Sequence, residues 1–161
     1  MKTVWITGAS SGFGAACVHW FAARGWRVGA WARRGDRLAE LLAEVAKAYP
    51  NAELWVDEVD VRDAKAVFEA WEARPFAEVD VLVNNAGLAR GRESIEEGDL
   101  ADWNEMIDTN LKGLLHVTRA VAPSMVARGT GHIINVGSLA GREAYPGGNV
   151  YGATKFAVDG L

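Results

Sequence analysis

Five short apolar runs, rich in valine, isoleucine and tryptophan, alternate along this chain with longer segments that carry apolar residues at helical spacing. Such alternation is typical of strand–helix–strand units, in which the strands are parallel and the connections right-handed. Several runs are almost continuously apolar, as strands covered on both faces require. We therefore predict an α/β fold of the Rossmann type: a doubly wound parallel sheet with helices on both faces.

The pattern also predicts where the elements lie. The expected strands cover residues 3–7, 26–32, 52–59, 79–85 and 132–138. The expected helices cover residues 14–24, 37–48, 64–73, 100–107 and 111–127, and a last helix begins near residue 149. No repeat or linker rich in Pro, Gly or Ser divides the chain, so residues 1–161 are expected to form one domain.

Composition excludes several classes of partner. The net charge is −4 and the basic residues are scattered, so we expect no nucleic-acid partner. No apolar run approaches the roughly 18 residues of a membrane span, and the N-terminal run is too short for a secretion signal. Cys17 is the one cysteine, which favours a reducing, cytoplasmic location. It and the histidines lack metal-ligand spacing, so no metal site is expected. The seven tryptophans are interpreted as core residues.

A glycine-rich turn follows the first expected strand. The segment TGASSGFG, residues 7–14, directly precedes a helix, and this context favours phosphate binding over a merely structural turn. Gly8 permits a sharp turn, while Gly12 and Gly14 permit close approach of backbone to phosphate and of helix to sheet. The helix N-terminus then attracts a pyrophosphate. The candidate cofactor residues here are Gly8, Ser10, Ser11, Gly12, Phe13 and Gly14.

The residues after the second expected strand favour NADP as the cofactor. A site that selects NAD usually places an acidic residue here to accept from the ribose hydroxyls. This chain reads WARRGDRL, with Arg33 and Arg34 in that region. Guanidinium groups suit a 2′-phosphate, although a pair of solvated surface arginines is the alternative. Asp36 is interpreted as the N-cap of the following helix.

Five motifs together resemble the short-chain dehydrogenase/reductase family in their order and spacing. They are TGASSGFG (7–14), NNAG (84–87), Asn110 within DTNLKG, GSLAG (137–141) and YGATK (151–155). Within that family, GFG in the first turn, ARRGDRL and the stretch MIDTNLKGLLHVTRAVAPSMV are similar to NADP-dependent 3-hydroxy acid dehydrogenases. This resemblance implies action on serine, allo-threonine or the matching semialdehydes. Another small ketone or secondary alcohol is the alternative substrate.

The resemblance also implies residue roles. Asn110, Ser138, Tyr151 and Lys155 match the family's catalytic tetrad, with Ser138 and Tyr151 contacting the substrate. The further cofactor contacts that it implies are made by Asp60 and Val61 beside the adenine, by Asn84, Asn85, Ala86 and Gly87 beside the ribose, and by Tyr151 and Lys155.

The chemistry of hydride transfer explains why these residue types are needed. An alcohol that loses a hydride must also lose a proton, and tyrosine is a poor base at its ordinary pKa of about 10. A lysine one helical turn away, together with the charge of the oxidised nicotinamide, favours the phenolate. Ser138 can hold the substrate oxygen, and Asn110 is expected to anchor a water that links Lys155 to solvent. Taken alone, a tyrosine four residues before a lysine is common and carries no such meaning.

Members of this family continue beyond the helix that carries the tyrosine and lysine. We therefore expect this chain to lack the last strands of the family fold, to leave its fifth strand as an open edge, and to be weak or inactive alone. Two hypotheses remain at this stage: the reductase itself, or a cofactor-binding module without turnover. The resemblance also implies a homo-oligomer formed through the helix over residues 111–127 and the helix from residue 149.

Overall fold

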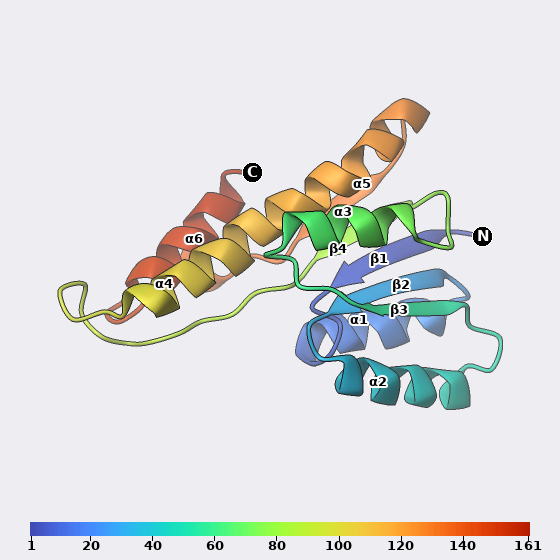
Figure 1. Ribbon diagram of the computed structural model, residues 1–161, viewed down its shortest axis with the longest axis horizontal. Coiled ribbons are helices and arrows are strands. Elements are labelled where there is room, and N and C mark those ends of the chain that lie inside the picture. Colours follow the sequence, from blue (N-terminus) through green and yellow to red (C-terminus); the bar gives the residue numbers. More distant parts are fainter.

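The computed structural model describes residues 1–161 and contains one five-stranded parallel sheet (Figure 1). The strands lie in the order β3-β2-β1-β4-β5, which confirms the doubly wound fold. Their bounds are β1 Thr3–Thr7, β2 Arg27–Ala32, β3 Leu54–Glu58, β4 Val81–Asn84 and β5 His132–Asn135. All five strands were expected, and each observed strand is as long as the expected one or shorter than it. After β3 the chain crosses back to form β4, which pairs with the free side of β1. The strand order therefore reverses at β1, and ligands bind at such a reversal in open sheets of this class.

Helices cover both faces of the sheet (Figure 1). Helices α1, Gly12–Ala22, and α2, Gly35–Ala48, lie on one face, and α3, Ala64–Glu72, and α5, Leu114–Arg128, lie on the other. Each face has its own buried cluster. The amphipathic pattern of α2 buries Leu38, Leu41 and Val45 against the sheet, as its spacing predicts.

The tryptophans fill only part of the core. Trp5, Trp31 and Trp71 pack edge to face between the sheet and α3, with ring centroids 5.1 to 6.4 Å apart. The core interpretation is wrong for Trp20 and Trp55, which are 51% and 40% exposed. Trp20 faces solvent on α1 and stacks with a guanidinium, and Trp55 lies on the edge strand β3, which has a neighbour on one side only.

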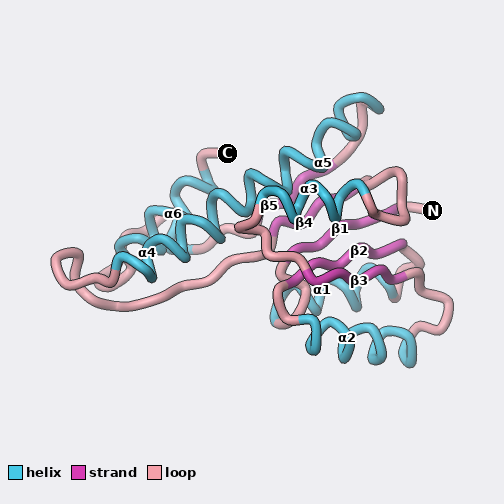
Figure 2. The backbone as a smooth tube through the Cα atoms, in the orientation of Figure 1, coloured by secondary structure: helices cyan, strands magenta, loops and turns pink.

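Two further helices lie beyond the sheet (Figure 2). Helix α4, Leu100–Ile107, runs into a π-helical turn at Asp108–Gly113 and then into α5. Helix α6, Asn149–Asp159, packs against α4, against the π-helical turn and against a short 3₁₀ turn at Leu139–Gly141. The helices over 100–107 and from residue 149 were expected. The π-helical turn was not, and it shifts the start of α5 to Leu114.

One capping prediction needs correction. Helix α2 begins at Gly35, so Arg34 rather than Asp36 occupies the N-cap. Asp36 lies in the first turn, where its negative charge still favours the helix N-terminus. Asp99 caps α4 through a hydrogen bond from the backbone N–H of Ala101 at 2.8 Å, and Asp102 lies inside the helix.

The second edge of the sheet, opposite β3, is β5. It pairs with β4 alone, and Ile133 and Ile134 are 37% and 40% exposed. This agrees with the expectation of an open fifth strand. None of the helices is both long enough and apolar enough to cross a bilayer.

Candidate active site

The glycine-rich turn between β1 and α1 is locked to the turn that follows β4. Gly8 has a φ of +65°, and a Cβ there would lie 2.8 Å from the Cα of Ala86. A Cβ on Gly14 would collide with the Gly8 carbonyl and with the side chain of Asn85. That side-chain amide donates to the carbonyls of Thr7 and Gly8 at 3.0 and 3.1 Å. Glycine is therefore required at positions 8 and 14 by close backbone packing.

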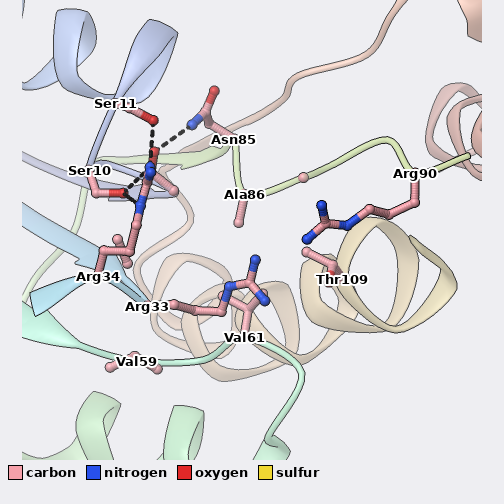
Figure 3. A pocket seen from close by; sticks show the side chains of 13 residues that line it. Ser10, Ser11, Arg33, Arg34, Val59, Val61, Asn85, Ala86, Arg90 and Thr109 are labelled. Atoms are coloured by element: carbon pink, nitrogen blue, oxygen red, sulfur yellow. Dashed lines mark hydrogen bonds between the residues drawn. The ribbon is translucent and has the colours of Figure 1, made fainter. Parts of the chain in front are cut away.

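A cavity of about 590 Å³ opens beside this turn, at the carboxyl ends of β1, β2 and β4 (Figure 3). Nine residues predicted to bind cofactor line it: Gly8, Ser10, Ser11, Arg33, Arg34, Val61, Asn85, Ala86 and Gly87. Four residues that sequence reasoning missed also line it: Ala32, Val59, Arg90 and Thr109. Arg90 could have been noticed, because it is a cation three residues after the NNAG motif.

Other predicted cofactor residues lie outside the cavity wall. Gly12 has a φ of +57° with open space before it, and Phe13 is 79% exposed. Gly14 packs against the Gly8 carbonyl and does not line the cavity. Asn84 is buried and its amide donates to Thr118 and Asn135 at 2.9 Å, which fixes the end of β4 instead.

The two arginines after β2 take different partners. Arg34 donates from Nη2 to the hydroxyl oxygens of Ser10 and Ser11 at 2.9 and 2.7 Å. Arg33 donates from Nη1 to Glu105 on α4 at 3.2 Å. Figure 3 shows the Arg34 guanidinium beside the glycine-rich turn and the Arg33 guanidinium at the opposite side of the cavity.

The carboxylate of Asp60 forms an ion pair with the neighbouring Arg62. The carboxylate accepts hydrogen bonds from Nε and Nη2 of Arg62. Partial burial alone would raise the pKa of Asp60, but these hydrogen bonds and the charge of Arg62 hold it below its usual value. Asp60 is absent from the cavity lining, whereas its neighbour Val61 is part of it.

The π-helical turn places Asn110 under the loop that follows β4. The Asn110 side chain accepts from the N–H of Leu88 and donates to its carbonyl, both at 2.8 Å. It also donates to the Thr154 hydroxyl on α6 at 3.1 Å. Asn110 is 2% exposed and fully engaged, so it ties three elements together at the cavity edge. Extra residues in π turns are frequent at functional sites.

Tyr151 and Lys155 lie on one face of α6, as their spacing predicts. Lys155 Nζ is 5.9 Å from the centroid of the Tyr151 ring and donates to the Val136 carbonyl at 2.8 Å. Burial lowers the pKa of Lys155, because an ammonium loses hydration when it is taken from water. Asn110 and Lys155 both approach Gly87, at 3.3 and 3.6 Å from where its Cβ would stand.

Ser138 stands three residues beyond the end of β5, rather than in the strand as expected. Its hydroxyl accepts from the N–H of Ala140 at 3.2 Å and begins the 3₁₀ turn that packs on α6. Tyr151 lines a second cavity of about 380 Å³, together with Ala89, Gly91, Arg92, Tyr145, Pro146 and Gly147. The structure thus groups Asn110 and Lys155 near Gly87, and sets Tyr151 at the wall of this second cavity.

The fold and the glycine-lined cavity define a Rossmann-type protein. Residues 2–161 match the family model described as short chain dehydrogenase, and the chain belongs to that family.

Named relatives agree with this membership. The NADP-dependent 3-hydroxy acid dehydrogenase of Escherichia coli K12 is 47% identical over 157 residues, which are 96% of this chain and 61% of the relative. Sulfoacetaldehyde reductase 2 of Chromohalobacter salexigens is also 47% identical, over 96% of this chain and 62% of its own. The closed form of serine dehydrogenase complexed with NADP⁺ is 46% identical with a TM-score of 0.92, and the match covers 98% of this chain and 62% of that one. The chain therefore spans about three fifths of the length of these relatives.

Proposed function

We propose that this protein is an NADP-dependent oxidoreductase that transfers a hydride between the nicotinamide and a small 3-hydroxy acid, such as serine or allo-threonine, or the matching semialdehyde. The observation that carries the proposal is the joint presence of an arginine-lined cavity beside the glycine-rich turn and a tyrosine–lysine pair on α6. The relatives named above support the same assignment.

The cavity has the donors that NADP requires. Glycines 8 and 14 let the backbone close tightly around the first turn, and the N-terminus of α1 points its N–H groups to this region. Arg34, held on Ser10 and Ser11, supplies a guanidinium for the 2′-phosphate. The buried hydroxyl of Thr109 has no hydrogen-bond partner within the protein, and Thr109 lines the same cavity. These observations fit a phosphorylated dinucleotide.

The proton transfer falls to residues of this chain. NADP, when bound, accepts or supplies the hydride. Tyr151 takes the proton from the substrate hydroxyl, or returns it to the carbonyl in reduction, and Ser138 donates a hydrogen bond to the same oxygen. Lys155, one turn away, favours the phenolate by its charge. Asn110 holds the Leu88 loop against α6, which keeps the cavity edge fixed beside this pair.

Arg92 favours an acid over a neutral alcohol as substrate. It lines the cavity that contains Tyr151, and its guanidinium makes no hydrogen bond or ion pair within the protein. A free guanidinium beside the reacting hydroxyl can take the carboxylate of a small hydroxy acid. A neutral ketone or secondary alcohol, the alternative substrate, would leave this cation without a partner.

We further propose that residues 1–161 act as one cofactor-binding unit of a cytoplasmic homo-oligomer. The exposed apolar side chains of Leu115 and Val126 on α5 and Phe156 on α6 support an interface there. Size-exclusion chromatography with light scattering tests the assembly. A monomer at all concentrations would contradict it.

The activity is tested by following NADPH absorbance with the purified protein. From residues 1–161 alone, only weak oxidation of serine and 3-hydroxybutyrate with NADP is expected, faster than with NAD and faster than oxidation of neutral secondary alcohols. NADP binding without turnover of any alcohol would favour the cofactor-binding module instead. No binding of NADP at all would refute the cofactor assignment.

A further inference from the structure

Glu105 on α4 stands at the meeting point of three arginines from three separate segments. Arg90, from the loop after β4, donates from Nε to Oε2 at 2.9 Å, and Arg33, after β2, donates from Nη1 to Oε1 at 3.2 Å. Arg62, after β3, reaches Oε1 at 3.6 Å. The hydrogen bonds from Arg90 and Arg33 lower the pKa of Glu105, so the carboxylate is charged at neutral pH.

These contacts form a bridge that joins two residues of the cavity wall through Glu105, which does not itself line the cavity. Figure 3 shows the side chains of Arg33 and Arg90 extending toward one another from opposite sides, and both residues line the cavity. Arg62 differs from the other two arginines, because its guanidinium donates to Asp60 and it does not line the cavity. The bridge therefore consists of Arg33, Glu105 and Arg90.

The two arginines of the bridge keep N–H groups that are not used in binding Glu105. Glu105 occupies Nη1 of Arg33 and Nε of Arg90, and the remaining side-chain N–H groups of both arginines make no hydrogen bond within the protein. Around the bridge three guanidiniums, Arg33, Arg62 and Arg90, face two carboxylates, Asp60 and Glu105, so the cluster keeps a positive charge. Three guanidiniums without the central carboxylate would repel one another and turn to solvent.

We propose that Glu105 is a positioning residue for the nucleotide: it holds Arg33 and Arg90 so that their free N–H groups face the phosphates of the bound cofactor. This inference rests on the proposed function, since it takes a phosphorylated nucleotide as the ligand. Arg90 thereby becomes a cofactor-contacting residue, and Glu105 acts only through the two arginines.

The test measures NADP affinity by calorimetry in the wild-type protein, in Glu105→Gln and in Glu69→Gln. Glu69 is an exposed glutamate on α3 that pairs with Lys65, so its substitution removes the same charge away from the cavity. We expect Glu105→Gln to weaken NADP binding about tenfold, the scale of a charged hydrogen bond, and Glu69→Gln to leave it within about twofold. Far-UV circular dichroism and urea unfolding verify that the variants remain folded.

A double-mutant cycle separates positioning from a merely structural role. If Glu105 acts through Arg90, Glu105→Gln costs less affinity in an Arg90→Gln background than in the wild-type protein, and Glu105→Asp restores part of the loss. Fully additive effects, unchanged affinity in Glu105→Gln, or tighter binding because a competing carboxylate is gone would each overturn the inference. Failure of the wild-type protein to bind NADP would instead refute the proposed function.

Discussion

Arg34 donates a hydrogen bond to the hydroxyl oxygen of Ser11 at 2.7 Å. This contact joins the end of β2 to the turn that precedes α1, two segments that meet at the same edge of the sheet because β1 and β2 are parallel neighbours. A guanidinium held in this place is oriented before any ligand arrives. Preorientation reduces the entropy lost when the side chain engages a phosphate.

Removing this guanidinium is expected to change cofactor preference. Arg34→Gln should weaken NADP binding about tenfold or more, since a charge-assisted hydrogen bond to a phosphate contributes on that scale, and should weaken NAD binding far less. Calorimetric titration with both dinucleotides measures the difference.

Arg37→Gln is the matched control for this prediction. Arg37 is exposed on the same helix and makes no hydrogen bond or ion pair, so its loss should affect neither dinucleotide. Equal losses of NADP and NAD affinity in Arg34→Gln would show that Arg34 does not recognise the 2′-phosphate.

The sheet and most helices could be predicted because their determinants are local. Apolar alternation and helical periodicity lie in the sequence itself, and the strand order follows from the rules of right-handed crossovers. The π-helical turn could not be predicted, because it depends on Asn110 bonding to Leu88 and Thr154, 22 and 44 residues away. The different partners of Arg33 and Arg34 depend likewise on Glu105, which is 72 residues from Arg33.

The glycine pattern predicted close packing at the first turn, and in the structure the packing is tighter at Gly14 than at Gly8. Gly14→Ala should destabilise the protein by about 2 kcal/mol or more, because its Cβ would meet the Gly8 carbonyl, a backbone atom that cannot move aside cheaply. For a chain of this size that corresponds to a fall in Tm of roughly 5 °C. Differential scanning fluorimetry is the measurement.

Gly160→Ala is the comparison for Gly14→Ala. A Cβ there would make an ordinary contact of 3.5 Å with the Ala157 carbonyl, so the Tm should change by less than about 1 °C. A Gly14→Ala protein as stable as the wild type would mean that the first turn can open without cost.

Tyr151 is expected to carry the proton transfer. Tyr151→Phe removes the hydroxyl but keeps the ring, so turnover should fall by about 10²- to 10⁴-fold while NADPH affinity stays close to that of the wild type. Stopped-flow absorbance with a semialdehyde measures the first quantity and fluorescence titration the second. Tyr49→Phe, distant from the cavity at the end of α2, serves as control. Retained turnover in Tyr151→Phe would remove this tyrosine from the mechanism.

Burial of the Lys155 ammonium is expected to make the stability of the protein depend on pH. Burial places its pKa in the folded protein below the value of 10.5 expected for an exposed lysine. Between these two pKa values the unfolded chain binds more protons than the folded one, so stability rises with pH across that window. At pH values below the window, the cost of burying the ammonium is fully present.

Lys155→Met removes this proton-binding difference. It also leaves the Val136 carbonyl without its donor, at a cost that does not depend on pH. The stability of the variant relative to the wild type should therefore decline as pH rises from the folded-state pKa of Lys155 toward 10.5, because only the wild type gains across the window. Urea unfolding at several pH values measures this difference, with Lys47→Met, an exposed lysine on α2, expected to follow the wild type. Parallel pH profiles for Lys155→Met and the wild type would show that the Lys155 ammonium is better hydrated than its 7% exposure implies.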